Sequence, residues 1–237
     1  MPTHNNLKEI RLAVTGGTSG LGLALVRSLV ARGARVAFVA RTARAVEQIA
    51  NETGAYGIVG DIGRKADTHP IALQVIGNLG GLDALINNAS ALGPTPLALL
   101  ADTECEELEQ ALSVNLLGPF RLTKALFGAL AASARNGRGA VVINISSDAA
   151  VNPYSGWGAY AASKAALAAL ARSLSAELAP RRIRVNCVAP TWREAPAEAK
   201  PIAAQKPAPA TDAAQTVLFL ASEESAGLTG QELVVGQ

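Results

Sequence analysis

Short apolar runs alternate with longer amphipathic segments along most of the chain. The first apolar run, residues 10–14, leads into apolar side chains at helical spacing over residues 20–32. Further strands are predicted at residues 35–39, 57–59, 84–86, 141–145, 184–188 and 231–235, and further helices at residues 43–51, 71–79, 103–134, 160–178 and 212–220. This alternation predicts an α/β fold with a doubly wound parallel sheet of about seven strands flanked by helices.

The chain is predicted to form a single domain, residues 1–237. It has no internal repeat, and the proline-rich stretch at residues 191–210 is followed by too little chain for a second domain. We interpret that stretch as a short loop and the polar residues 1–9 as a flexible tail. The pair Gly118-Pro119 is expected to bend the long helical region.

Composition narrows the class of protein. The chain of 237 residues is 49% hydrophobic but only 4% aromatic, so Ala, Leu, Val and Ile must supply most of the core. Its net charge is +2 and its basic residues are scattered, which argues against a nucleic-acid partner. No apolar run is long enough for a membrane span, and the first residues lack the apolar segment of a signal peptide. The sequence therefore predicts a soluble protein of a reducing compartment, the cytoplasm.

The cysteines and histidines give no sign of a metal site. Cys105 and Cys187 lie far apart, and neither has the spacing of a metal or redox motif. His4 and His69 have no companion ligands. We therefore predict reduced thiols, surface histidines and no bound metal.

A glycine-rich stretch joins the first strand to the first helix. Gly16 is expected to allow a tight turn, Gly20 the approach of a ligand phosphate, and Gly22 close packing of the helix on the strand. The start of the helix offers unpaired N–H groups and the positive end of its dipole, which suit a pyrophosphate. The alternative is a glycine-rich connection that binds no ligand.

A second cluster combines a tyrosine, a lysine and a serine. Tyr160 and Lys164 are one helical turn apart and therefore share a helix face. A nearby lysine favours the phenolate, which would suit Tyr160 for acid–base work near neutral pH. Ser147 ends a buried strand at the sheet edge where ligands bind, whereas Ser146 is expected to point to the opposite face. An ordinary surface pair and a capping serine are the structural alternatives.

Together these residues resemble the short-chain dehydrogenase/reductase family, in its short single-domain branch, over nearly the whole chain. The motifs that carry the resemblance, in chain order, are Thr15-Gly-Gly-Thr-Ser-Gly-Leu-Gly22, Asp61, Asn87-Asn88-Ala89, Asn115, Asn144-Ile-Ser-Ser147 and Tyr160-x-x-x-Lys164. The resemblance implies a Rossmann-like fold, a nicotinamide dinucleotide cofactor and a homo-oligomer.

The resemblance also implies a role for each catalytic residue. Tyr160 would exchange a proton with the substrate oxygen while a hydride moves to or from the nicotinamide. Ser147 would hold that oxygen, and Lys164 would lower the pKa of Tyr160 and bind the nicotinamide ribose. Asn115 would hold a water that continues a proton path from Lys164. The residues implied for cofactor binding are Gly16, Thr18, Ser19, Leu21, Gly22, Arg41, Asp61, Ile62, Asn88, Ala89, Tyr160, Lys164 and Pro190.

The form of the cofactor follows from the end of the second strand. Ala40 stands where NAD-preferring relatives carry an acidic residue that binds the ribose hydroxyls. Arg41 follows, and its charge would attract a 2′-phosphate. We therefore expect NADP(H), with NAD(H) as the weaker possibility. The alternative is that Arg41 is a solvated surface charge.

Two departures from the family concern the substrate side. Pro190 is followed by Thr191 where the family usually has Pro-Gly, so the positioning of the carboxamide does not transfer directly to Thr191. The segment 191–210 is shorter than the covering helices of relatives, so the pocket is open or the segment orders with ligand. Trp157 and Trp192 either line this pocket or pack in the core.

We predict an NADP(H)-dependent enzyme that interconverts a small to medium, fairly apolar carbonyl compound and its secondary alcohol. The alternative is a sensor or scaffold that binds the cofactor with little or no turnover. The helices around residues 115–134 and 160–178 carry Ala and Leu on more than one face, which predicts a homodimer or homotetramer.

Overall fold

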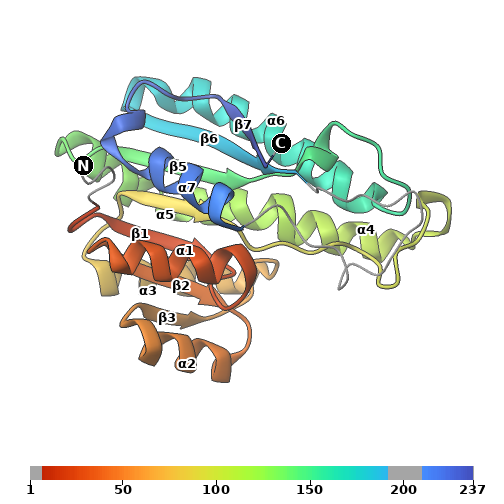
Figure 1. Cartoon of the computed structure of the whole chain (residues 1–237), viewed down its shortest axis with the longest axis horizontal. Coiled ribbons are helices and arrows are strands. Elements are labelled where there is room, and N and C mark those ends of the chain that lie inside the picture. Colours follow the sequence, from red (N-terminus) through yellow and green to blue (C-terminus); the bar gives the residue numbers. More distant parts are fainter. Residues whose placement is uncertain (1–6, 192–209, 237) are drawn as a thin grey trace.

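The computed structural model describes residues 7–191 and 210–236 and contains one seven-stranded parallel sheet (Figure 1). The spatial order of the strands is β3-β2-β1-β4-β5-β6-β7. They are β1 (Arg11–Thr15), β2 (Arg35–Ala40), β3 (Tyr56–Val59), β4 (Ala84–Asn87), β5 (Ala140–Ile145), β6 (Ile183–Pro190) and β7 (Glu232–Val235). The predicted doubly wound sheet is confirmed, because strands that alternate with helices along the chain lie parallel in one layer.

Helices cover both faces of this sheet. They are α1 (Gly20–Ala31), α2 (Ala43–Thr53), α3 (Thr68–Leu79), α4 (Cys105–Leu112), α5 (Gly118–Arg135), α6 (Gly158–Leu178) and α7 (Ala210–Ala221). One apolar cluster joins α1, α2 and α7 to the sheet, and a second joins α3, α5 and α6 to its other face. Neighbouring strand residues point to opposite faces, so Val14 belongs to the first cluster and Ala13 to the second. Burial on both faces explains why the strands appear as continuous apolar runs.

The long helical region predicted at residues 103–134 is interrupted. α4 is followed by a π-helical turn, Ser113–Leu117, and α5 begins at Gly118. Pro119 lies in the first turn of α5, where a missing N–H is tolerated. The interruption therefore lies just before the Gly118-Pro119 pair, and the π-helical turn contains Asn115.

The winding direction of the sheet reverses at β1, which lies between β2 and β4. At such a point the carboxyl ends of adjacent strands open a crevice in which α/β proteins bind ligands. Thr15 ends β1, Asn87 ends β4 and Ile145 ends β5. The glycine turn, the Asn88-Ala89 pair and Ser147 therefore all start from the same edge of the sheet.

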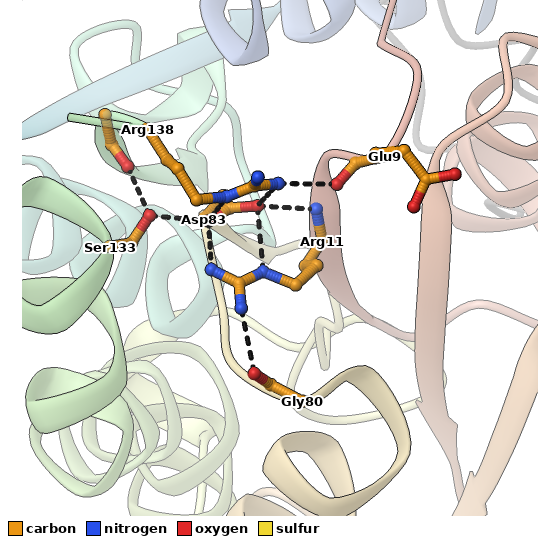
Figure 2. Close-up of polar contacts among 7 residues, drawn as sticks. Glu9, Arg11, Gly80, Asp83, Ser133 and Arg138 are labelled. Atoms are coloured by element: carbon orange, nitrogen blue, oxygen red, sulfur yellow. Dashed lines mark hydrogen bonds and ion pairs between the residues drawn. The ribbon is translucent and has the colours of Figure 1, made fainter. Parts of the chain in front are cut away.

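The opposite edge is held together by a buried carboxylate, Asp83, which precedes β4 (Figure 2). The Arg11 guanidinium pairs with both carboxylate oxygens, with Nη2 2.6 Å from Oδ1 and Nε 3.0 Å from Oδ2. Arg138 approaches Oδ2 at 3.1 Å, and the Ser133 hydroxyl donates to Oδ1. Burial by itself would raise the pKa of Asp83, but these hydrogen bonds together hold it well below its usual range. The cluster joins β1, β4 and the α5–β5 connection at the amino ends of the strands.

Candidate functional site

The glycine turn after β1 is shaped by contacts that exclude larger side chains. Gly16 has a φ of +73°, a left-handed conformation that favours glycine, and its N–H donates to the Val39 carbonyl oxygen at 2.8 Å. A Cβ on Gly22 would overlap the Gly16 carbonyl oxygen, so only glycine lets α1 start this close to the strand. A Cβ on Gly20 would meet none of the described atoms within 4 Å. The turn is therefore open at Gly20, where a phosphate is expected to approach.

The turn is fastened to the residues that follow β4. The Thr15 hydroxyl accepts hydrogen bonds from the N–H groups of Asn88 and Ala89, both at 3.0 Å. The Asn88 side chain donates to the Thr15 carbonyl oxygen at 2.8 Å. Thr15 is fully buried, so these bonds fix the two strand ends relative to each other and preform the crevice.

A cavity of about 680 Å³ occupies this crevice, which is within the usual size range of small-molecule sites. Ten of the predicted cofactor-binding residues line it: Gly16, Thr18, Ser19, Leu21, Gly22, Arg41, Asp61, Ile62, Asn88 and Ala89. Within the described ranges, Tyr160, Lys164 and Pro190 are not among its lining residues. The sequence analysis missed several others, including Val39, Thr42 and the loop residues Ser90, Leu92 and Thr95.

The polar groups of this cavity fit a dinucleotide. Across the described residues, Ser19 makes no side-chain capping bond at the start of α1, and the first turn carries no acidic residue. The N–H groups of that turn therefore keep their capacity for a phosphate, at the positive end of the helix dipole. Arg41 lines the cavity with an exposed side chain, directly after Ala40 at the end of β2. A cationic group next to a small apolar residue is compatible with an extra phosphate on the ribose.

Ser147 follows β5 and caps the short helical turn Asp148–Ala150. Its Oγ accepts from Ala149 N at 3.2 Å and donates to Asp148 Oδ1 at 3.2 Å. The capping role that sequence analysis left open is therefore real, and it accompanies a position beside Tyr160. Ser146 continues the sheet instead, because its N–H donates to the Val188 carbonyl oxygen at 2.8 Å. Its Oγ is buried and has no hydrogen-bond partner among the described residues.

Tyr160 and Lys164 lie together on α6 and are both buried, with 7% and 2% of their surface exposed. The Lys164 ammonium lies 5.5 Å from the centre of the Tyr160 ring. It donates a hydrogen bond to the Ile145 carbonyl oxygen at 2.7 Å. The surface-pair alternative is wrong, because the helix face that carries both residues packs against the end of β5.

The direction of the Tyr160 pKa differs from the sequence-based expectation. Burial of the phenol raises the pKa of Tyr160, and hydrogen bonds with the Ser147 and Ser90 hydroxyls only partly oppose this effect. Burial also lowers the pKa of Lys164 to about 8. The net direction of the Tyr160 pKa is therefore opposite to the expected lowering, because loss of hydration dominates.

Asn115 uses its whole side chain to hold the π-helical turn in place. Its Oδ1 accepts from Ala91 N at 2.8 Å and from Ser90 Oγ at 3.2 Å. Its Nδ2 donates to the Ala91 carbonyl oxygen at 2.7 Å and to Ser163 Oγ at 2.8 Å. Both donors and both acceptor positions of the amide are thus used. The side chain joins the loop after β4 to α6, and all four hydrogen-bonding positions of its amide are taken by protein groups.

Ser90 is a site residue that the sequence analysis did not single out. It lines the cavity, donates to Asn115 Oδ1, and lies close enough to the Tyr160 phenol to influence its pKa. It directly follows the Asn87-Asn88-Ala89 motif, and that adjacency was the only signal in the sequence. Ser90 therefore connects the cofactor-sized cavity to the Tyr160 hydroxyl.

The end of β6 and the tryptophans account for the remaining predicted residues. Pro190 is the last residue of β6 and pairs with Val235 of β7. The Thr191 N–H and hydroxyl both donate to the Val235 carbonyl oxygen, at 2.9 Å and 3.1 Å. Trp157 is buried with its ring edge on Tyr160, 5.5 Å between centres, so it packs beneath the site. Trp192 and most of the predicted loop at residues 191–210 lie outside the described residues.

Other chemistry-bearing residues stand apart from this site. Cys105 is exposed on α4, whereas Cys187 is buried in β6, and both are free thiols. Within residues 7–191 and 210–236, no group of three or more potential ligands is arranged for a metal ion. Over the same ranges, none of the helices combines the length and apolarity that a membrane crossing requires.

Comparison with protein families matches residues 11–206 to the short chain dehydrogenase model. The human protein "Dehydrogenase/reductase SDR family member 4" is 34% identical over 241 residues, which cover 94% of this chain and 84% of the relative. The glycine turn, Asn115, Ser147, Tyr160 and Lys164 all lie within the matched residues.

Two solved structures have the same architecture over nearly the full length of both chains. A 3-ketoacyl-(acyl-carrier-protein) reductase from Brucella melitensis, complexed with NADH, superposes with a TM-score of 0.87 at 26% identity and 97% coverage of each chain. A short chain dehydrogenase from Burkholderia cenocepacia, in complex with NADP, superposes with a TM-score of 0.84 at 28% identity and 98% coverage of each chain.

Proposed function

The chain belongs to the short chain dehydrogenase family, and on that premise we propose that it is an oxidoreductase that transfers a hydride between NADP(H) and a carbonyl compound or its secondary alcohol. One observation carries the proposal. Ser90 lines the cavity that fits a dinucleotide, and its hydroxyl lies close enough to the Tyr160 phenol to influence the pKa of that phenol. The proton-transfer group and the cofactor cavity are therefore adjacent.

The residues around Tyr160 would handle the proton of the reaction. A bound nicotinamide would supply or accept the hydride. Because burial raises the pKa of Tyr160, its phenol is protonated at neutral pH and can donate to the substrate oxygen during reduction. Ser147 would add a second hydrogen bond to the same oxygen by turning its hydroxyl proton from Asp148 toward the substrate. Lys164, held by the Ile145 carbonyl, would add a cation that favours the phenolate left behind.

A water relay from Lys164 would use the backbone of the π-helical turn rather than the Asn115 amide. That amide already makes four hydrogen bonds. A π-helical turn has irregular backbone bonding, so one of its carbonyl oxygens is the better candidate for holding a water. Asn115 would then act by keeping this turn in place.

The preference for NADP(H) rests on Arg41. Its exposed guanidinium lines the cavity next to Ala40, and relatives of known structure hold NADH in one case and NADP in the other. We propose that Arg41 pairs with the 2′-phosphate. Titration of the protein with each reduced cofactor, followed by nicotinamide fluorescence, should give a lower Kd for NADPH. Equal or tighter binding of NADH would reject the preference.

The substrate is proposed to be a small to medium, fairly apolar carbonyl compound or alcohol. Tyr160 belongs to an apolar cluster with Trp157 and Ala149, against which Leu92 and Leu97 pack. A panel of ketones and aldehydes with NADPH tests the activity, with NADPH consumption as the readout. Turnover of any member supports an enzyme. Tight NADPH binding without turnover across the panel would instead support a sensor or scaffold.

We also propose a cytoplasmic location and a homodimer or homotetramer. The location rests on the two free thiols, which suit a reducing compartment. The oligomer rests on α5, where Leu117 just before the helix and Phe120 in its first turn are 38% and 40% exposed. Large apolar side chains at neighbouring positions on one surface are typical of a protein interface.

A further inference from the structure

Asp148 is a buried carboxylate next to the Tyr160–Ser147 pair. It directly follows Ser147 and is 6% exposed. Its Oδ1 accepts from the Ser147 hydroxyl at 3.2 Å, and its Oδ2 accepts from the Tyr154 hydroxyl at 2.7 Å. A buried carboxylate with both oxygens in hydrogen bonds has a defined orientation. None of the roles assigned above uses this group.

Tyr154 anchors the carboxylate. The hydrogen bond to Asp148, aided by burial, raises the pKa of Tyr154 to about 12, so its hydroxyl stays protonated and keeps donating at physiological pH. The Tyr154 ring also packs on Trp157, with 6.0 Å between ring centres, and Trp157 packs on Tyr160. Asp148 is therefore held by a member of an aromatic cluster that includes the proposed catalytic tyrosine.

The protons around Ser147 can be counted. A serine hydroxyl has one proton to donate and two lone pairs that accept. The proton is directed to Asp148, and one lone pair accepts from Ala149 N. The second lone pair is not used by these two bonds, and the Ser147 hydroxyl lies close enough to the Tyr160 phenol to influence its pKa. Asp148 therefore fixes the direction of the Ser147 O–H bond.

We propose that Asp148, anchored by Tyr154, is a positioning residue that orients the Ser147 hydroxyl and holds Tyr160 in its proton-donating form. The inference rests on the proposed function for its consequence in catalysis, but the orientation and the charge effect belong to the protein itself. A negative charge next to a phenol disfavours the phenolate. In agreement, after burial as the largest cause, the charge of Asp148 also raises the pKa of Tyr160.

The other groups near Tyr160 in the described part of the chain influence its pKa in directions that follow from their charge. Lys164, from the same helix, is the opposing cation, and Ser90, from the loop after β4, is a neutral hydroxyl whose proton goes to Asn115. Cys187, on β6, acts on Lys164 rather than on the phenol. Asp148 is thus the negatively charged group that acts on Tyr160, and neutralising it should make the phenol more acidic.

The first test reads the phenol directly and needs no turnover. The chain has three tyrosines, so the ultraviolet absorbance of phenolate can be followed with pH in a Tyr56→Phe background, and Tyr160→Phe identifies the transition of Tyr160. In that background Asp148→Asn should shift the Tyr160 midpoint to lower pH by about 0.5–1 unit. Glu177→Gln, which removes an exposed carboxylate of the same helix, should leave it in place. An unchanged or more alkaline midpoint in folded Asp148→Asn would overturn the proposal.

A second variant separates orientation from charge. Tyr154→Phe keeps the Asp148 carboxylate but removes its anchor, so we expect kcat/KM for carbonyl reduction to fall by about 3–10-fold while the alkaline limb of its pH profile stays in place. Asp148→Asn should move that limb to lower pH by the same amount as the absorbance midpoint. A Tyr154→Phe enzyme with unchanged kcat/KM would refute the anchoring. If the chain proves to have no turnover, the absorbance titration still decides the role of Asp148, and only the proposed function fails.

Discussion

The Lys164 ammonium donates a hydrogen bond to the Ile145 carbonyl oxygen at 2.7 Å, inside the protein at the carboxyl end of β5. This bond ties α6 to the strand that leads into Ser147. It also places a lysine with 2% of its surface exposed next to the Tyr160 ring. The Ile145 carbonyl oxygen replaces only part of the hydration that a free ammonium would have, so burial disfavours the charged form of Lys164.

This burial predicts a pH-dependent contribution to stability. Burial lowers the pKa of Lys164 to about 8 from an ordinary value of 10.5. As the pH rises from about 8 toward 10.5, the folded lysine loses its proton before the unfolded one does, so its contribution to the free energy of unfolding increases. Between about pH 7 and about pH 9, the wild type should gain about 1 kcal/mol relative to Lys164→Met. Urea denaturation at both pH values measures this difference.

The control is Lys124→Met, which removes an exposed lysine of α5. It should follow the wild-type pH dependence. If Lys164→Met followed the wild type as well, Lys164 would not have a lowered pKa in the folded protein.

Removal of the phenol hydroxyl should abolish turnover without loss of cofactor binding. Tyr160→Phe keeps the ring that packs on Trp157, so the fold should persist, while kcat should fall by at least about 100-fold because the proton donor is gone. The Kd for NADPH should rise by no more than about tenfold, since a phenol hydroxyl adds one hydrogen bond at most. Tyr56→Phe, at an exposed residue of β3, is the matched control. Full activity in Tyr160→Phe would reject its acid–base role.

Arg41 should discriminate between the two cofactors. Arg41→Ala removes one charge-assisted contact, so NADPH binding should weaken by about 10–100-fold, whereas NADH binding should barely change. Arg44→Ala is the matched control, because Arg44 is an exposed residue of α2 that is not among the described residues lining the cavity. Equal weakening of both cofactors, or of neither, would show that Arg41 does not read the 2′-phosphate.

Gly22 should tolerate no added methyl group. In Gly22→Ala the new Cβ would overlap the Gly16 carbonyl oxygen, so the start of α1 must move. We expect a loss of about 2 kcal/mol or more in stability, together with loss of cofactor binding. Gly128→Ala is the control, because a Cβ there meets no described atom within 4 Å inside α5, and it should stabilise by about 0.5–1 kcal/mol. Thermal unfolding with and without NADPH distinguishes these results.

The apolar side chains on α5 predict association between copies of this chain. Light scattering coupled to size-exclusion chromatography should give the mass of a dimer or a tetramer at micromolar concentration. Phe120→Glu, which puts a charge at a 40% exposed position of α5, should shift the protein toward the monomer. A wild-type monomer at that concentration would contradict the proposal.

Some predictions from the sequence failed for identifiable physical reasons. The helical region at residues 103–134 gave no sign of its π-helical turn, because that turn depends on bonds from Asn115 to Ala91 and Ser163. Ser90 and Asp148 were missed because each becomes important only through a partner from another part of the fold. The predicted direction of the Tyr160 pKa shift was wrong because helical spacing shows the nearby lysine but not how deeply the phenol is buried.

The sequence by itself determined the parallel sheet, the glycine turn and the position of Tyr160 one helical turn before Lys164. These features depend on local patterns, namely the apolar period of strands and helices, the backbone freedom of Gly16 and the absence of a side chain at Gly22. Only the tertiary structure decided which polar groups meet around the Tyr160 hydroxyl and how they shift its pKa. Hydrogen-bond partners and loss of hydration arise when segments far apart in the chain pack together, and no local sequence pattern encodes which of these segments meet.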